Sequence, residues 1–464
     1  MADDETADVL LRTVSNLDLK WGRLSYSEQL QIIHWTILQS VNDMLARPWF
    51  KRTWVVQEVF RARKVGGPKF HGTPDAVIHI GGKAILWGAF ASFINGFKNQ
   101  IHISRLGRLK HIEPNDLTDW KLFLRTWQDL WNRYIQTGDT YDILQLMHKT
   151  TSFLATDPRD KFFAMMQLAR NTREDERLHP LVRTNYNKTL SQVTRDFTEW
   201  HILRTRRVGV LNMLSLKKET EIGEPSWVPN ILNPTDECPF LRLPSYIHDE
   251  YDGFLSSTKF SRDGIHPFQV RGRSLFARGM QICRVAHVVS KLVADPASRK
   301  IENPVKVIGE EWGLVNLALD ILNRDKKPRL EPENFSSDLL KMVGCYGDEE
   351  AEAGFELHRR GHAMEINDQK LVDIYFDRAS SWCHHRRLFL DDRGSMGLCP
   401  EGTEDGDIVV MLQSSFVPHV LRVLDDGPYG MLGPCLYYGG KWLQGEADDY
   451  QKMYNVQPEW FEIW

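Results

Sequence analysis

The chain has 464 residues, a hydrophobic fraction of 42% and a formal net charge of −4. Its length suits two or three domains, and its composition is that of an ordinary globular protein, which excludes a fibrous or wholly disordered chain. Nucleic-acid binding would need a larger basic face than this sequence offers. We therefore expect no nucleic-acid partner, and we expect the densest cationic run, Arg204 to Arg207, to be the solvated end of a helix.

Cysteine usage and the first residues predict where the protein works. The six cysteines are widely scattered and form no CxxC pair, which is typical of reduced, intracellular chains. The start, "MADDETADVLLRTV", is acidic where a signal peptide would be basic, and no long uncharged apolar run follows it. The sequence thus predicts a soluble cytoplasmic protein, with the nucleus as an alternative, and no membrane partner.

The first elements in chain order are helices. Ser25 to Glu28 has the spacing of a capping box, and apolar residues recur behind it at helical intervals as far as Met44. Pro48 interrupts that helix and is suited to open the next one, because proline at the first helical position loses no hydrogen bond. The stretch "RPWFKRTWVVQEV" is aromatic on most sides of this second helix, so we expect it to be buried. Glu58 would then lie near the core and need a partner such as Arg61.

The rest of the chain alternates between helical and extended patterns. Residues 77–80 are predicted as a strand, "KAILWGAFASFI" and "DWKLFLRTWQDLWNRYI" as helices, and "TDPRDKFFAMMQLA" as a helix capped by Asp157. A proline-rich connection over 225–239 precedes extended strands in "FQVRGRSLFARGMQICRVAHVV" and a mainly helical stretch over 306–343. Short apolar runs between turn residues then favour a small antiparallel β barrel or roll at the C-terminus.

These patterns together predict an α+β fold in three segments. Residues 1–222 form a mainly helical region, residues 223–370 a mixed α/β region with the proline-rich connection, and residues 371–464 a small β module.

Motifs for common chemistry are weak or incomplete. The glycine–lysine pairs at Gly82 and Gly440 lack the remaining positions of a phosphate loop, and no GxGxxG sequence follows a strand. Cys383-His384-His385 does not make a metal site on a strand, because its middle residue faces the other way and only Cys399 is close in sequence. We predict no cofactor and no metal. Glu58 is the one candidate catalytic residue, against the alternative that it forms a structural ion pair with an arginine.

The segment "RPWFKRTWVVQEV" resembles the closing signature of the heterokaryon-incompatibility (HET) domain family of filamentous fungi. The matching positions are Arg47, Trp49, Phe50, Arg52, Trp54, Gln57 and Glu58. Later blocks resemble the family in the same order: "ATDPRDKFFAMMQLA", "NYNKTLSQV", "PSWVP" and the final run from "GDIVVMLQ" to "WLQGEA". The family's usual opening blocks, Leu-Ser-Tyr-x-Trp-Gly and Ile-Asp-x-x-Cys-Ile-Asn-Gln, are not found. The chain therefore resembles a HET protein with an incomplete α/β signature domain.

This resemblance implies a regulatory protein of heterokaryon incompatibility, in which nonself recognition triggers programmed cell death, acting through protein partners. An alternative comes from the similarity of the HET domain to the TIR fold, some members of which cleave NAD. It would make the chain an NAD- or nucleotide-cleaving enzyme with Glu58 in or beside the site. A third reading is a truncated, non-functional family member. The resemblance assigns no residue of this chain as catalytic.

Overall fold

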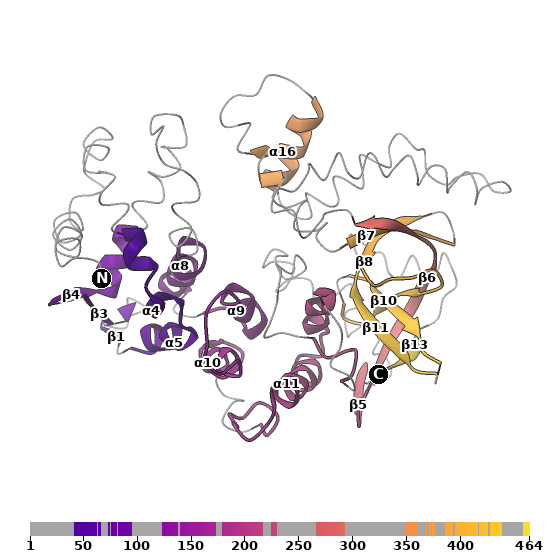
Figure 1. The fold of residues 1–464 in the computed structure, drawn as a ribbon, viewed down its shortest axis with the longest axis horizontal. Helices are drawn as coiled ribbons and strands as arrows, with labels where there is room; N and C mark the ends of the chain where they lie inside the picture. Colours follow the sequence, from indigo (N-terminus) through magenta and orange to yellow (C-terminus); the bar gives the residue numbers. More distant parts are fainter. Residues whose placement is uncertain are drawn as a thin grey trace. The chain divides into compact units, whose positions relative to one another are not determined.

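The computed structural model contains both helices and strands and is of the α+β class (Figure 1). The chain divides into two compact units, residues 1–187 and 188–464, which we describe separately. The structure describes residues 41–62, 64–65, 73–74, 76–80, 82–94, 123–137, 140–172, 179–216, 224–229, 266–292, 349–360, 368, 371–372, 374–375, 386–392, 395–415, 417–425, 427–438 and 458–464. The predicted helix cap at Ser25 to Glu28, the helical stretch over 306–343 and Cys383 to His385 lie outside these residues.

Helices dominate the first unit, as predicted. They are α4 (Pro48–Lys51), α5 (Thr53–Arg61), the π-helical turn η3 (Leu124–Gln128), α8 (Asp129–Thr137), α9 (Ile143–Lys149) and α10 (Asp160–Leu168), with further helical residues at 41–45 and 87–94. Two hairpins accompany them, β1 (Lys64–Val65) with β2 (Thr73–Pro74) and β3 (Val77–Ile80) with β4 (Lys83–Leu86).

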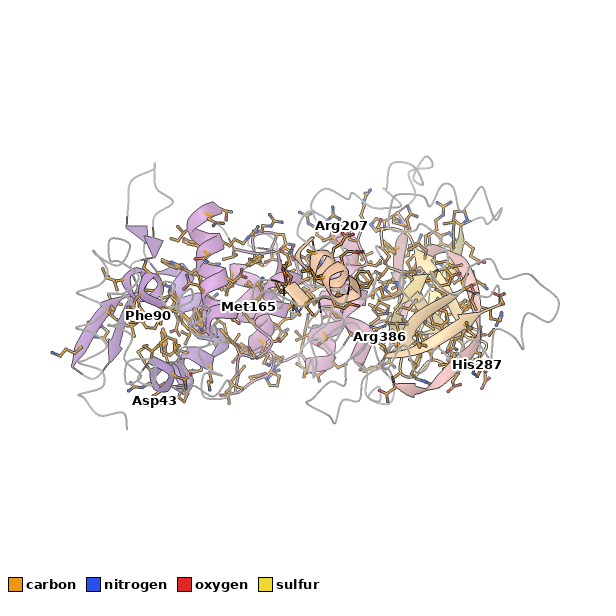
Figure 2. The ribbon with its side chains drawn as sticks, turned by 90° about the horizontal axis from the view of Figure 1, so that it is seen from above. Asp43, Phe90, Met165, Arg207, His287 and Arg386 are labelled. Carbon is orange, nitrogen blue, oxygen red and sulfur yellow. The ribbon has the colours of Figure 1, made fainter. Side chains whose placement is uncertain are left out.

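An aromatic cluster forms the core of the first unit. Trp127 is 1% exposed at its centre, and its indole N–H donates a hydrogen bond to the carbonyl of Phe50 at 3.0 Å. Five rings surround it within 6.5 Å, centroid to centroid: Trp49, Phe60, Trp87, Phe123 and Phe153. Phe90, labelled in Figure 2, closes the cluster against Trp87 and Phe50. The predicted stripe from Phe123 to Tyr134 is thus confirmed as buried core.

The expected helix "KAILWGAFASFI" is wrong at its start. Its first residues form strand β4, and the helix begins only at Trp87. The two strands of the hairpin place Ile78 opposite Ile85, and both side chains are buried. Packing of this isoleucine pair against the core overrides the helical propensity of the segment.

The second unit begins with helices and continues as a sheet. Its helices are α11 (Leu190–Thr205), the 3₁₀ segment η4 (Gly209–Leu216) and α16 (Glu349–Arg360). A capping box between Thr189 and Gln192 starts α11, and Arg206 ends it in the left-handed conformation with φ 54°. Arg204 and Arg206 are exposed there, which confirms the solvated helix end expected at this cationic run.

A nine-stranded sheet makes up the rest of the second unit. Its strands are β5 (Phe268–Arg271), β6 (Ser274–Leu292), β7 (Arg386–Asp391), β8 (Met396–Pro400), β9 (Ile408–Leu412), β10 (His419–Val423), β11 (Tyr429–Pro434), β12 (Leu436–Tyr438) and β13 (Glu459–Ile463). The 19-residue β6 pairs with β5, β13, β9 and β7 along its length. The pairings β6–β13–β11–β10–β9–β6 form a closed cycle.

This sheet differs from the predicted module in two ways. It is mixed rather than purely antiparallel, because β11 and β13 run parallel. It also includes β5 and β6 of residues 268–292, so the predicted middle and C-terminal segments share one sheet. The length of β6 is the cause, since register shifts let one strand change partners along its course. Within the described residues, no helix is both long and apolar enough to cross a membrane.

Candidate functional site

The HET-like signature segment folds as two helices rather than one. Arg52 lies between α4 and α5 in an extended conformation, φ −87° and ψ 132°, and forms a parallel β-bridge with Leu154. The N–H of Leu154 donates to the carbonyl of Lys51 at 2.5 Å, and the N–H of Thr53 donates to the carbonyl of Leu154 at 3.0 Å. This bridge satisfies a carbonyl at the end of α4 and an N–H at the start of α5. It therefore stabilises the break between the two helices.

The aromatic residues of the signature belong to the core. Phe50 is 6% exposed, and its ring packs edge-on against Trp49 and Phe123. Trp49 is half-buried and lies parallel to Trp127, at 6.5 Å and 3°. These contacts hold α4 in place, so the dense aromatic content of this segment serves packing first.

Glu58 is exposed, contrary to the prediction that it lies near the core. The buried face of α5 is formed by Val55, Val56, Val59 and Phe60. Trp54, Glu58 and Arg61 follow one another at helical spacing on the opposite side, where Trp54 is half-buried and the other two are exposed. The prediction failed because the apolar side chains of α5 already fill the side of the helix that faces the core.

Polar residues of α5 tie it to α10. The side-chain amide of Gln57 donates to the side-chain oxygen of Gln167, and the guanidinium of Arg61 donates to the main-chain carbonyl of Gln167. Arg61 therefore binds α10 in the described structure rather than serving as the predicted partner of Glu58. Sequence reasoning missed Gln167 and Leu154, because nothing in the local pattern marks either residue as a neighbour of the signature.

Arg47 and Arg52 complete the signature. Arg47 is half-buried at the N-terminal end of α4, and it supplies no side-chain cap to that helix. Arg52 is exposed beside Leu154, whose apolar side chain is 59% exposed. The signature thus exposes Arg52 beside an uncovered leucine.

A second cluster surrounds Arg159 in the block "TDPRDKF". The guanidinium of Arg159 donates from Nε and Nη2 to the two oxygens of Asp157 at 2.9 and 2.6 Å, and from Nη1 to the carbonyl of Tyr186 at 2.8 Å. The hydroxyl of Tyr186 donates to Asp160 at 2.7 Å. Hydrogen bonding from Arg159 lowers the pKa of Asp157, while burial and then Asp160 raise the pKa of Tyr186 to about 12. Because these shifts keep Asp157 ionised and Tyr186 protonated, the cluster is suited to a structural role rather than to acid–base chemistry.

The predicted role of Asp157 needs a correction in detail. Helix α10 begins at Asp160, with Arg159 in the capping position and no side-chain cap. Asp157 instead accepts from the backbone N–H of Arg159 at 3.0 Å, in the turn that precedes the helix. This is an Asx-type turn that leads the chain into the helix.

Three buried thiols and one buried histidine of the second unit are held neutral. The thiols of Cys283, Cys399 and Cys435 are buried and free, and burial raises the pKa of Cys399 to about 11. The hydroxyl of Tyr437 donates to Asp391 at 2.6 Å inside the same core. His419 is fully buried, and burial followed by the charge of Arg386 lowers its pKa to about 3. Protonated thiols and a neutral imidazole without an exposed face do not form a nucleophilic centre.

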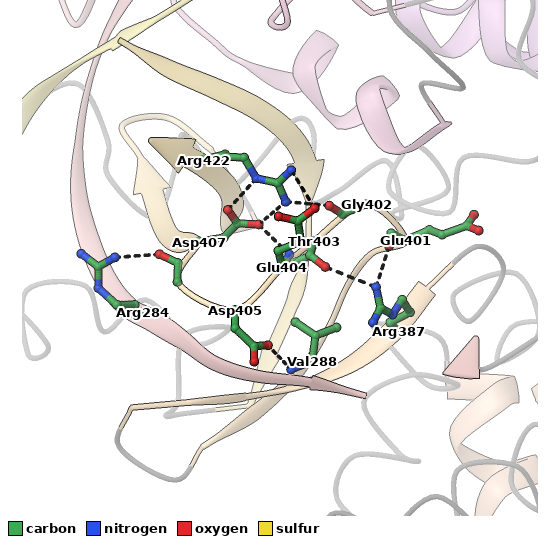
Figure 3. A network of polar contacts seen from close by, with 11 residues as sticks. Arg284, Val288, Arg387, Glu401, Gly402, Thr403, Glu404, Asp405, Asp407 and Arg422 are labelled. Carbon is green, nitrogen blue, oxygen red and sulfur yellow. Dashed lines mark hydrogen bonds and ion pairs between the residues drawn. The ribbon is translucent and has the colours of Figure 1, made fainter. Parts of the chain in front are cut away.

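An acidic loop between β8 and β9 is braced by arginines (Figure 3). The guanidinium of Arg422 donates from Nε and Nη2 to the two oxygens of Asp407, each at 2.9 Å. Arg284 donates to the carbonyl of Gly406 at 2.7 Å, and Asp405 accepts from the backbone N–H of Val288 at 2.8 Å. These contacts attach the loop to β6 and β10. They give its charged residues a structural role, so no catalytic role is needed to explain them. Among the described residues, no group of three or more His, Cys, Asp or Glu side chains is placed to hold a metal ion.

No family model, no curated protein and no solved structure matches this chain.

Proposed function

We propose that the chain is a HET-like regulatory protein of fungal heterokaryon incompatibility that acts through protein contacts in nonself recognition and cell death. The ordered signature blocks of the sequence support this role. We further propose that it works in the cytoplasm, and that the closed cycle of strand pairings in the second unit forms a small β-barrel.

The observation that carries the proposal is the division of the signature into a buried half and an exposed half. Trp49 and Phe50 build the core, whereas Arg52 and Glu58 are exposed on the same pair of helices. Packing accounts for the aromatic residues, but it does not account for the exposed charges. Arginine is a residue type enriched in interface hot spots, and the uncovered Leu154 beside Arg52 adds apolar surface for a partner to cover.

The enzymatic alternative has less support from this geometry. A catalytic carboxylate works best where water is excluded and its surroundings are fixed. Glu58 is exposed on a helix surface instead. The reading as a truncated, non-functional member also has less support, since Trp87 and Trp127 are 0% and 1% exposed in a closed aromatic core.

The test is expression of the chain in fungal hyphae. We expect the wild-type protein to arrest growth, and we expect Arg52→Glu and Glu58→Lys to abolish the arrest while leaving the melting temperature of the purified protein unchanged. Arg183→Glu and Asp425→Lys are matched controls, because they make the same charge changes at exposed positions outside the signature segment. Wild-type protein that leaves growth unaffected, or control variants as inactive as the two signature variants, would contradict the proposal.

The alternative is tested in the same preparations. Nicotinamide release from NAD by the purified chain, lost in Glu58→Gln, would establish the enzymatic reading. We expect no such release.

A further inference from the structure

The strand that runs through β11 and β12 changes its partner at Cys435. Strand β11 pairs with β10, whereas β12 pairs with β8. Between them, the backbone N–H of Cys435 donates to the carbonyl of Pro418, next to β10, at 2.8 Å. The N–H and the carbonyl of one residue in an extended strand point to the same side. The main chain at Cys435 therefore faces β10 and turns away from β8.

Cys399 of β8 lies across from Cys435. The antiparallel register of β8 and β12 sets Leu436 opposite Leu398, and one further step in this register sets Cys435 opposite Cys399. Because the main chain at Cys435 turns away from β8, the two cysteines form a non-hydrogen-bonded pair, in which the Cα atoms lie about 4.5 Å apart. A disulfide needs a Cα separation of about 4.4–6.8 Å. The pair is therefore at bridging distance.

The two thiols belong to the same core. Both side chains are 0% exposed, both are reduced, and both lie in one hydrophobic cluster together with Cys283. Burial, and after it the proximity of Cys399, raises the pKa of Cys435. The Sγ of Cys399 donates to the carbonyl of Arg387 at 3.2 Å, so it has to turn from this carbonyl to meet Cys435. Cys283 is placed differently, because it lies opposite Val409 in the ladder of β6 and β9.

We propose that Cys399 and Cys435 form a reversible disulfide when a small-molecule disulfide of the glutathione class oxidises the protein. The thiolate of one cysteine attacks a sulfur of the reagent, which forms a mixed disulfide and expels one glutathione thiolate. The thiolate of the other cysteine then attacks the protein-bound sulfur and expels the second glutathione. The two protein thiols are oxidised and lose two protons, which the two glutathione thiolates take up.

Burial controls how fast this exchange occurs. The thiolate is the reacting species, and burial raises the pKa of Cys399 to about 11, so the closed fold reacts slowly. The ladder between β8 and β12 contains three residue pairs, and its local opening is the route by which the reagent reaches the thiols. Once formed, the bond holds β12 on β8 at the point where the strand leaves β10. Oxidation therefore locks a short ladder that is otherwise able to open.

The first experiment identifies the bond in the purified full-length chain. The protein is incubated with excess oxidised glutathione, its remaining thiols are blocked with iodoacetamide, and it is digested with trypsin without reductant. Cleavage after Arg422 and Lys441 places Cys399 in peptide 394–422 and Cys435 in peptide 423–441, each with a single cysteine. We expect the joined pair of peptides by mass spectrometry, absent before oxidation and after treatment with dithiothreitol.

The second experiment measures what the bond does to the fold. We expect hydrogen exchange at residues 396–400 and 436–438 to slow roughly tenfold or more in the oxidised wild type relative to the reduced form. Cys399→Ala should lose both the joined peptides and the slower exchange. Cys283→Ala is the matched control, since it removes a thiol from the same core and should keep both. Alanine suits these positions because a buried cysteine packs as a small apolar side chain.

Three results would overturn the inference. One is the absence of joined peptides after oxidation in urea just below the unfolding transition, where the ladder opens most often. Another is a bond from Cys283 to either cysteine in place of the pair. The third is joined peptides without any change in hydrogen exchange, because the bond would then not act on the ladder.

The disulfide is independent of the protein-contact role proposed above. Both cysteines belong to the second unit, whereas the signature segment belongs to the first. Growth arrest in hyphae that depends on Arg52 and Glu58 would therefore stand without the disulfide, and the disulfide would stand without growth arrest.

Discussion

His419 should make the second unit sensitive to mild acid. Its ring is fully buried, and neither nitrogen has good hydrogen-bond geometry with a described neighbour, although the backbone of Val417 slightly favours the protonated form. The folded pKa is about 3 because of burial and the nearby charge of Arg386. In the unfolded chain, a histidine pKa is about 6.5. Between these two pKa values, His419 binds a proton in the unfolded state but not in the folded state. Stability therefore falls as the pH is lowered through this window.

The size of the effect follows from the difference in pKa. A pH of about 5 lies some 1.5 units below the pKa of the histidine in the unfolded chain. Protonation of the unfolded chain at this pH therefore lowers the stability by about 2 kcal/mol relative to neutral pH. His201, in the same unit, is also fully buried with a pKa lowered to about 3 by burial and by Arg207, so it should contribute a similar loss. Removing one of the two should halve the acid sensitivity.

The assay compares His419→Leu with the wild type. Leucine has a similar volume and does not titrate, so the variant should keep the fold and lose only the proton linkage. Urea unfolding at several pH values from neutral to about 5 gives the free energy of unfolding at each. We expect the pH dependence of His419→Leu to be about half that of the wild type. Equal pH dependence in His419→Leu and wild type would refute the buried neutral imidazole.

Further outcomes follow from other contacts. Trp127→Ala should lower the free energy of unfolding of the first unit by about 3–5 kcal/mol, measured by urea titration, because it empties the centre of the aromatic cluster. Arg422→Ala should cost roughly 2–3 kcal/mol by the same measurement, since Asp407 is only 4% exposed, with the 30% exposure of Arg422 reducing the loss. A double-mutant cycle with Asp407→Asn should show strong coupling. Thr189→Ala, which removes the cap of α11, should cost about 1 kcal/mol in thermal unfolding. Glu58→Gln should change stability by less than about 0.5 kcal/mol in thermal unfolding, as its exposure requires.

Local patterns predicted the elements whose signals lie within a few residues. Pro48 begins α4 as expected, and the hydrophobic spacing from Phe123 to Tyr134 marks a buried helical face. The strand at residues 77–80 and the extended segments of β5 and β6 were also recognisable from sequence. In each case, the periodicity of one segment carries the information needed.

Features made by distant residues were not predictable in this way. The break at Arg52 depends on Leu154, which is supplied by a segment a hundred residues further along the chain. The carboxyl group of Glu58 was expected near the core because the sequence around it is aromatic. Its exposure follows from the apolar side of α5 facing the core, while Gln57 and Gln167 attach the helix to α10. No pattern within the signature segment indicates that Leu154 or Gln167 is its neighbour.

The same distinction explains why the signature alone is a poor guide to chemistry. A segment rich in tryptophan, arginine and glutamate resembles an active site when it is read as a string, because catalytic groups are often embedded among apolar residues. In the fold, α5 turns Val55, Val59 and Phe60 toward the core, while Glu58 on its other side is exposed to solvent. An exposed charge on a rigid, well-packed helix is poorly placed to shift a pKa but well placed to meet another surface. In the proposed recognition role, the packed aromatic core fixes the positions of Arg52 and Glu58 before a partner arrives, which lowers the entropy lost on binding.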